Sequence, residues 1–109
     1  MVKVKFYRNK DDIIYGFEAH NHTKNIVCSA VSVLTLNTIN SIEKFTDEEF
    51  TCDFKEQGGF LKIILPEVKR GKFNKDVDLL SNSCLLGVMG IKADYAEYIE
   101  VTDGRCCSC

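Results

Sequence analysis

The apolar residues of this chain recur with a period of two in some stretches and with a helical period in others, and the order of these stretches limits the possible folds. Val2, Val4 and Phe6 alternate with other residue types, which is the pattern of a half-buried strand. A second alternating stretch covers residues 13–19, and a polar turn at residues 9–12 separates the two. We therefore expect a β-hairpin at the start of the chain.

The next stretch changes to a helical period and predicts a long helix from Val27 to Phe45, with Asn25 as its N-cap. Its apolar stripe consists of Val27, Val31, Leu34, Ile42 and Phe45, widened by Val33, Leu36 and Ile39. This stripe is wider than the apolar arc of a simple surface helix. We expect the helix to be covered on two sides, by the sheet and by either the second helix or a partner subunit.

The second half of the chain repeats the order of two strands and a helix. The predicted elements are strands at residues 50–55 and 60–65 joined by a turn at Gln57-Gly58-Gly59, a basic loop at 68–74, a helix at 76–96 and a short strand at 98–102. The apolar stripe of this second helix is Val77, Leu80, Cys84, Val88, Ile91 and Tyr95. Gly87 and Gly90 lower its helix propensity but permit close packing.

The element order is therefore ββαββα with a short terminal strand. This order predicts an α+β fold, a two-layer sandwich of a mainly antiparallel sheet and two helices. A length of 109 residues suits one compact domain. We assign residues 1–103 to this single domain and residues 104–109 to a cysteine-rich tail, which we expect to lack regular structure.

The six cysteines of the chain do not predict a disulfide framework. Cys28, Cys52 and Cys84 lie inside predicted elements with apolar neighbours, and the N-terminal sequence MVKVKFYRNK alternates in a way that the core of a signal peptide does not. We expect reduced thiols and a cytoplasmic protein. No apolar run is long enough to span a membrane, and the net charge of −2 argues against electrostatic binding of nucleic acid.

The segment FEAHNHTKNIVCSAVSVL places both histidines of the chain, His20 and His22, shortly before Cys28 in the first turn of the predicted helix. The pKa of a thiol falls at a helix N-terminus or beside an imidazolium, and the backbone N–H groups of the same turn can hold an oxyanion. A base, a thiolate and such donors are the groups that acyl transfer requires. The residues alone leave open that Cys28 is a small core residue and that both histidines are solvated.

The same segment resembles the bacterial ribosomal-processing cysteine proteases, the Prp family. NIVCSAVS at residues 25–32 is similar to the family's DIVCAAVS, and Asn21-His22-Thr23 stands where the family has GHA. KFYRN near the start, VLTLNTINSIEKF in the first helix and GGFLKI in the second hairpin also look like the family. The resemblance extends to about Asp103.

The resemblance implies a cysteine endopeptidase that removes the N-terminal extension of a large-subunit ribosomal protein precursor. It implies Cys28 as the nucleophile and His22, rather than His20, as the general base and acid. The supporting residues that it suggests are Ser32, Asn25 in place of the family's aspartate, Asn21 in place of its glycine, and Ser29 as a backbone oxyanion donor. The extension of the family's substrate ends in aromatic or apolar residues, and Tyr15 or Phe17 could line a groove for them.

The precursor peptide is therefore the expected partner, together with a second copy of the chain bound through the apolar first helix; we expect no cofactor, metal, membrane or nucleic acid. The loop between His22 and Cys28 is shorter than in most members of the family, which bears on activity. An alternative function is a non-catalytic module that binds a peptide or the ribosome with the same fold. A third is a metal or redox role for the tail, but Cys106, Cys107 and Cys109 lack the partners of a tetrahedral metal site.

Overall fold

The computed structural model of the chain describes residues 1–20, 26–55 and 59–105. Its elements are β1 (Val2–Arg8), β2 (Ile14–His20), α1 (Ile26–Phe45), β3 (Thr51–Lys55), β4 (Phe60–Ile64), α2 (Pro66–Lys69), α3 (Lys75–Asp94) and β5 (Ile99–Arg105). The predicted order of the strands and the two long helices is confirmed. The short helix α2 was not predicted and takes up the start of the basic loop, because a proline at the first helical position has a φ angle suited to a helix start.

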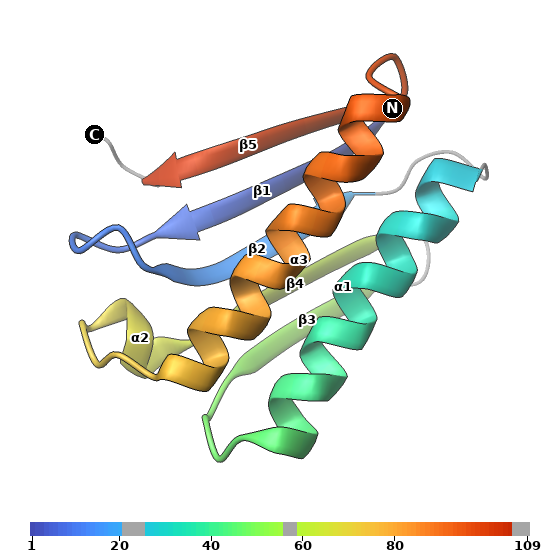
Figure 1. The fold of residues 1–109 in the computed structure, drawn as a ribbon. Helices are drawn as coiled ribbons and strands as arrows, with labels where there is room; N and C mark the ends of the chain where they lie inside the picture. The colour runs from blue at the N-terminus through green and yellow to red at the C-terminus, as the bar shows by residue number, and fades with distance from the viewer. Residues whose placement is uncertain (21–25, 56–58, 106–109) are drawn as a thin grey trace.

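The five strands form one mixed sheet in the order β3-β4-β2-β1-β5. Three of the neighbouring pairs are antiparallel, and β5 runs parallel to β1. Figure 1 shows α1 and α3 side by side on one side of the sheet, with α1 toward β4 and β3 and α3 toward β2 and β1. The two-layer sandwich with a mainly antiparallel sheet is thus confirmed. We call the covered side of the sheet the helix face and the other side the open face.

The core lies between the helix face and the two long helices. Phe6 pairs with Phe17, and Val4 pairs with Ala19, across β1 and β2, and all four side chains are buried. The two phenylalanine rings have their centroids 5.5 Å apart. The core continues with Val2, Ile14, Val27, Val31, Ile42, Ile63, Leu65, Val77, Val88 and Ile99. Burial of these side chains is the main favourable term in the folding of such a domain.

The helix α1 buries a narrower face than its sequence predicts. Its buried residues are Val27, Val31, Thr35, Thr38, Ile39 and Ile42. Phe45 is 70% exposed, so its place in the predicted stripe is wrong, and Val33 and Leu36 are exposed as well. The second cover of α1 is α3, which packs against it on the side of Leu34. The exposed apolar residues therefore lie on the outer surface of the helix layer.

The two glycines of α3 have different surroundings. A Cβ atom at Gly87 would lie 2.9 Å from Cδ1 of Leu34 in α1, which is closer than real Cβ contacts come. At Gly90 such an atom would meet nothing within 4 Å among the described residues, so the prediction of close packing holds for Gly87 and is wrong for Gly90. Tyr95, which the sequence placed in the apolar stripe, is the C-cap of α3 and is exposed.

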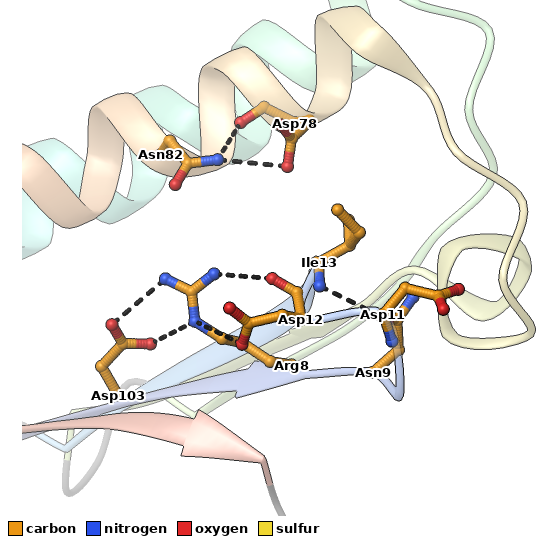
Figure 2. A network of polar contacts seen from close by, with 8 residues as sticks. All are labelled: Arg8, Asn9, Asp11, Asp12, Ile13, Asp78, Asn82 and Asp103. Atoms are coloured by element: carbon orange, nitrogen blue, oxygen red, sulfur yellow. Dashed lines mark hydrogen bonds and ion pairs between the residues drawn. The ribbon is translucent and has the colours of Figure 1, made fainter.

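The last strand is longer than predicted and is anchored by an arginine. β5 includes Gly104, which was assigned to the tail, and Arg105 is its last residue. Figure 2 shows the guanidinium of Arg8 between Asp103 of β5 and the turn after β1, with Nε 2.8 Å from Oδ1 of Asp103 and Nη1 2.9 Å from the carbonyl oxygen of Asp12. The hydrogen bond to Asp103 raises the pKa of Arg8. This network fastens an edge strand to the first hairpin at the end of the sheet where β5 finishes.

The helix α1 is also long and apolar enough, by length and composition, to cross a membrane. Core helices of soluble proteins pass the same test, so it is weak evidence. The fold explains the apolar character of α1, because six residues of this helix are buried in the core and α3 packs beside it.

Candidate active site

Cys28 is the third residue of α1 and therefore lies in its first turn. Its side chain is half-buried and packs against the edge of the core. The first four N–H groups of an α-helix have no acceptor within the helix, and the aligned peptide dipoles make this end positive. The first turn of α1 contains no acidic residue that would neutralise this end. A helix start of this kind favours a negatively charged group placed beside it, such as the oxyanion of a reaction intermediate.

The position of Cys28 around the helix axis decides which part of the molecule it faces. Because successive residues of an α-helix are rotated by about 100°, Ser32 lies about 40° from Cys28 around the axis and Leu34 lies about 120° from it. Leu34 is the residue that packs on α3. The flank of α1 that carries Cys28 and Ser32 is therefore turned away from α3, and α1 itself lies over the side of the sheet that ends with β3 (Figure 1).

The other two described cysteines, Cys84 and Cys52, have surroundings that disfavour the thiolate. Cys84, in the middle of α3, is 2% exposed, and burial raises the pKa of its thiol. The pKa of Cys52, in β3, is raised by partial burial and by the neighbouring carboxylate of Asp53. All three thiols lie in regular elements, as predicted, but only Cys28 lies at a helix start.

His20 is turned away from the helix layer. It is the last residue of β2 and follows Ala19, whose side chain is buried on the helix face, so strand alternation puts His20 on the open face. There its Nε2 atom is 2.5 Å from Oε2 of Glu18, and its ring packs against the edge of Phe60, with the centroids 4.9 Å apart. It also lines a cavity of about 370 Å³ on that face, next to Lys3. The sheet thus separates His20 from the flank of α1 that carries Cys28.

His22, the predicted partner of Cys28, lies outside the described residues, as do Asn21 and Asn25. The segment that contains them is short, because β2 ends at His20 and α1 begins at Ile26. A segment of five residues can span at most about 17 Å when fully extended. The pairing of His22 with Cys28 stays a prediction. Ser29 is the fourth residue of α1 and is exposed in its first turn.

The structure also exposes an aromatic residue that the sequence did not single out. Phe54 of β3 pairs with Leu61, whose side chain is buried on the helix face, yet Phe54 itself is 58% exposed.

Tyr15 and Phe17 were proposed to line a substrate groove, but both are buried. Phe17 lies in the core, and the ring of Tyr15 stacks on that of Tyr7, so the proposal is wrong for both residues. Alternation in the sequence indicates which residues share a face but not whether that face is covered.

Among the described residues there is no group of three or more histidine, cysteine, aspartate or glutamate side chains placed to hold a metal ion. The tail cysteines Cys106, Cys107 and Cys109 are outside that part of the chain. Since β5 runs parallel to β1, β5 ends beside the end of β1, whereas β2 ends beside the start of β1. The described residues nearest in sequence to the tail and to His22 therefore lie at opposite ends of the sheet.

The family model for the cysteine protease Prp matches residues 1–100 of this chain. The ribosomal processing cysteine protease Prp of Bacillus subtilis (strain 168) is 23% identical over 108 residues, which cover 94% of this chain and 96% of that protein.

The fold is also similar to solved structures. Prp from S. aureus in complex with a substrate peptide superposes with a TM-score of 0.85 at 20% identity, and the match covers 95% of this chain and all of that one, 100%. The same protease with a covalently linked product peptide gives a TM-score of 0.84 at 21% identity with the same coverage, 95% and 100%. SMU.848 from Streptococcus mutans gives 0.82 at 28% identity, covering 96% of this chain and 95% of that one.

Proposed function

The chain belongs to the Prp family of cysteine proteases, and from this premise we propose that it is the endopeptidase that removes the N-terminal extension of a ribosomal protein precursor, with Cys28 as nucleophile and His22 as general base. The observation that carries the proposal is the position of Cys28 in an acid-free first turn of α1, directly after the segment that contains His22. The B. subtilis relative is named for ribosomal processing, and the S. aureus enzyme was solved with substrate and product peptides.

The proposed reaction is acyl transfer through a thioester. His22 takes the proton of the Cys28 thiol, and the sulfur attacks the carbonyl carbon of the scissile peptide bond. The oxyanion that forms accepts hydrogen bonds from backbone N–H groups of the first turn, including that of Ser29. The imidazolium then gives its proton to the leaving amine as the C–N bond breaks. A water molecule, deprotonated by His22, attacks the thioester and releases the new carboxylate and the thiol.

Three further side chains have supporting roles in this proposal. Ser32 lies one turn after Cys28 on the same flank of α1, where a hydroxyl can hydrogen-bond either to the reacting groups or back to its own helix. Asn25 is the expected N-cap by sequence, and Asn21 stands where the family has glycine; asparagine is one of the few residues that tolerate the left-handed conformation. Ser32→Ala tests the supporting role of this hydroxyl. We expect its loss of cleavage activity to be much smaller than the loss in Cys28→Ala.

The test uses the precursor of the large-subunit ribosomal protein from the same organism. We expect the wild-type protein to cleave it once, near its N-terminus, and Cys28→Ala and His22→Ala to leave it intact. His20→Ala is the matched control and should cleave at close to the wild-type rate, because His20 lies on the open face. An intact precursor with folded wild-type protein, together with measurable binding, would instead support the non-catalytic binding module.

We also propose a cytoplasmic homodimer that associates through the outer surface of the helix layer. Ile26, Val33, Leu79 and Leu86 are all exposed there by more than half of their surface. Apolar residues gathered on one side of a domain mark interaction surfaces. Light scattering should give the mass of two chains for the wild type and of one chain for Val33→Lys, with Lys44→Ala as the control on the same helix.

A further inference from the structure

We propose that β3 binds the substrate peptide as an added strand at the edge of the sheet, and that Phe54 selects an apolar side chain of that peptide. This inference rests on the function proposed above and specifies where the peptide lies.

The first observation is that β3 has an open edge. It is the outermost strand on the α1 side of the sheet, and among the described residues it pairs with β4 alone. All five of its residues, Thr51–Lys55, are exposed. The outer edge of such a strand presents backbone N–H and C=O groups to which an extended peptide can pair.

The second observation is that the two faces of β3 differ in chemistry. Cys52 and Phe54 pair with Ile63 and Leu61, residues of the helix face, so they point to the side of the sheet on which α1 lies. Asp53 and Lys55 alternate with them and point to the open face. A peptide strand beside β3 would meet apolar surface on one face and charges on the other. Its own side chains should therefore alternate between apolar and polar.

The third observation connects this edge to Cys28. The last residue of β3, Lys55, pairs with Phe60, and Phe60 pairs with His20 at the end of β2. β3 therefore ends at the same end of the sheet as β2, and α1, whose first turn contains Cys28, lies over the β3 side of the sheet (Figure 1). We therefore expect the peptide side chain on Phe54 to belong to a residue near the scissile bond, with each intervening strand residue spanning about 3.3 Å.

The charged side chains of β3 are compatible with two roles of this edge, which are peptide binding and protection against aggregation. Short edge strands with charged side chains resist pairing with other copies of the same chain. In β3 the charges are confined to the open face, and the helix face keeps an aromatic ring that is 58% exposed. The other edge strand, β5, lies at the far side of the sheet, where α3 rather than α1 contacts it.

The test measures cleavage and binding separately. Phe54→Ala should raise KM for the precursor peptide about tenfold with a small change in kcat. Phe73→Ala is the matched control, since Phe73 is 60% exposed in the loop before α3, and its KM should stay within about twofold of wild type. Alkylation of Cys28 by iodoacetamide should proceed at the same rate in both variants, because the small reagent does not use the β3 edge. An unchanged KM in Phe54→Ala would overturn the proposal.

Binding to the Cys28→Ala protein separates this inference from the proposed protease activity. A fluorescent precursor peptide should bind it, and adding Phe54→Ala should weaken the binding about tenfold. Peptides N-methylated at successive positions should lose affinity at every second position, since a strand pairs through alternate residues. If the peptide binds, if Phe54→Ala weakens that binding and if the wild type nevertheless cleaves nothing, the β3 site stands and the proposed protease activity is rejected. Peptide affinity that is unchanged by Phe54→Ala and that does not alternate with the position of N-methylation would reject the β3 site. A Phe54→Ala variant that changes only the oligomeric state would reject it as well.

Discussion

α1 and α3 are both 20-residue helices, and they pack side by side on the same face of the sheet, but they begin in different ways. At the start of α3 the side chain of Asn74 accepts hydrogen bonds from the backbone N–H groups of Asp76 and Val77, and two aspartates lie in the first turn. The first turn of α1 has no acidic residue and contains Cys28 instead. The positive end of α3 is thus neutralised within the chain, whereas the described first turn of α1 has no carboxylate to do the same.

The cysteines of the two helices show the same difference. Cys84 lies in the middle of α3 with its sulfur 4.0 Å from the carbonyl oxygen of Leu34 in α1, and burial raises its pKa. Cys28 lies at a helix start and is half-buried. The comparison shows that two cysteines of one fold differ in burial and in position on their helices, and our proposal assigns packing to Cys84 and chemistry to Cys28 on that basis.

The largest expected effect comes from removing each thiol in turn. Cys28→Ala should lower kcat/KM for the precursor peptide by at least about 10³-fold, because no other group can form the thioester. Cys84→Ala should leave kcat/KM within about threefold of wild type and instead lower the free energy of unfolding, as the loss of a buried side chain does. Steady-state kinetics and urea unfolding measure the two effects. Comparable losses of activity in both variants would remove the distinction between the two helices.

Adding a carboxylate to the first turn of α1, or removing one from the first turn of α3, should change the stability of the protein and, for α1 alone, its cleavage activity. Ser29→Asp gives α1 an acidic first turn, so it should stabilise the protein by about 0.5 kcal/mol and lower kcat/KM about tenfold, because the carboxylate disfavours negative charge at the same helix end. Asp76→Ser in α3 is the reverse change and should cost about 0.5 kcal/mol without affecting cleavage. Urea unfolding and peptide cleavage, both at low salt, measure the outcome. Full activity in Ser29→Asp would show that the helix end does not assist the reaction.

A smaller effect on stability should separate the two glycines of α3. Gly90→Ala should raise the free energy of unfolding by about 0.5–1 kcal/mol, because alanine has the better helix propensity and a Cβ there meets no described atom within 4 Å. Gly87→Ala should gain less or lose stability, because its Cβ requires Leu34 of α1 to move. If the two variants are equally stable, α1 and α3 do not pack as closely at Gly87 as described.

The smallest expected effect is the contribution of Cys84 to alkaline sensitivity. Its pKa is raised in the folded protein above the usual value of 9.0, so the folded state favours the neutral thiol. This contribution to stability is fully present below about pH 9 and is lost as the pH rises through the higher, folded value. The difference in unfolding free energy between wild type and Cys84→Ala should therefore shrink above pH 9. A difference that stays constant up to pH 11 would contradict the raised pKa.

Much of this fold follows from the sequence, because burial on one side of a strand or helix leaves a periodic pattern. The first hairpin, both long helices and the position of Cys28 in a first helical turn were predicted in this way. The pattern could not give the parallel pairing of β5 with β1, which depends on contacts between the two ends of the chain. It also could not show α2, whose four residues are too few for a helical period.

The candidate site was predictable to a similar degree. The sequence identified Cys28 by its helix start, but two histidines were within reach, and residue chemistry alone did not distinguish them. The alternation of β2, seen together with the buried Ala19, is what turns His20 to the open face. The exposure of Phe54 was not predictable, because it depends on which strand lies at the edge of the sheet and on how far α1 reaches over it.

The measurement that tests the central claim most directly is the rate of alkylation of each thiol by iodoacetamide at pH 7, followed by mass spectrometry of the digested protein. The account predicts that Cys28 reacts at least about 10²-fold faster than Cys84 and clearly faster than Cys52, and that His22→Ala removes most of this advantage while His20→Ala does not. Alkylation of Cys28 no faster than that of Cys52, and unchanged by His22→Ala, would contradict an activated thiolate at the start of α1.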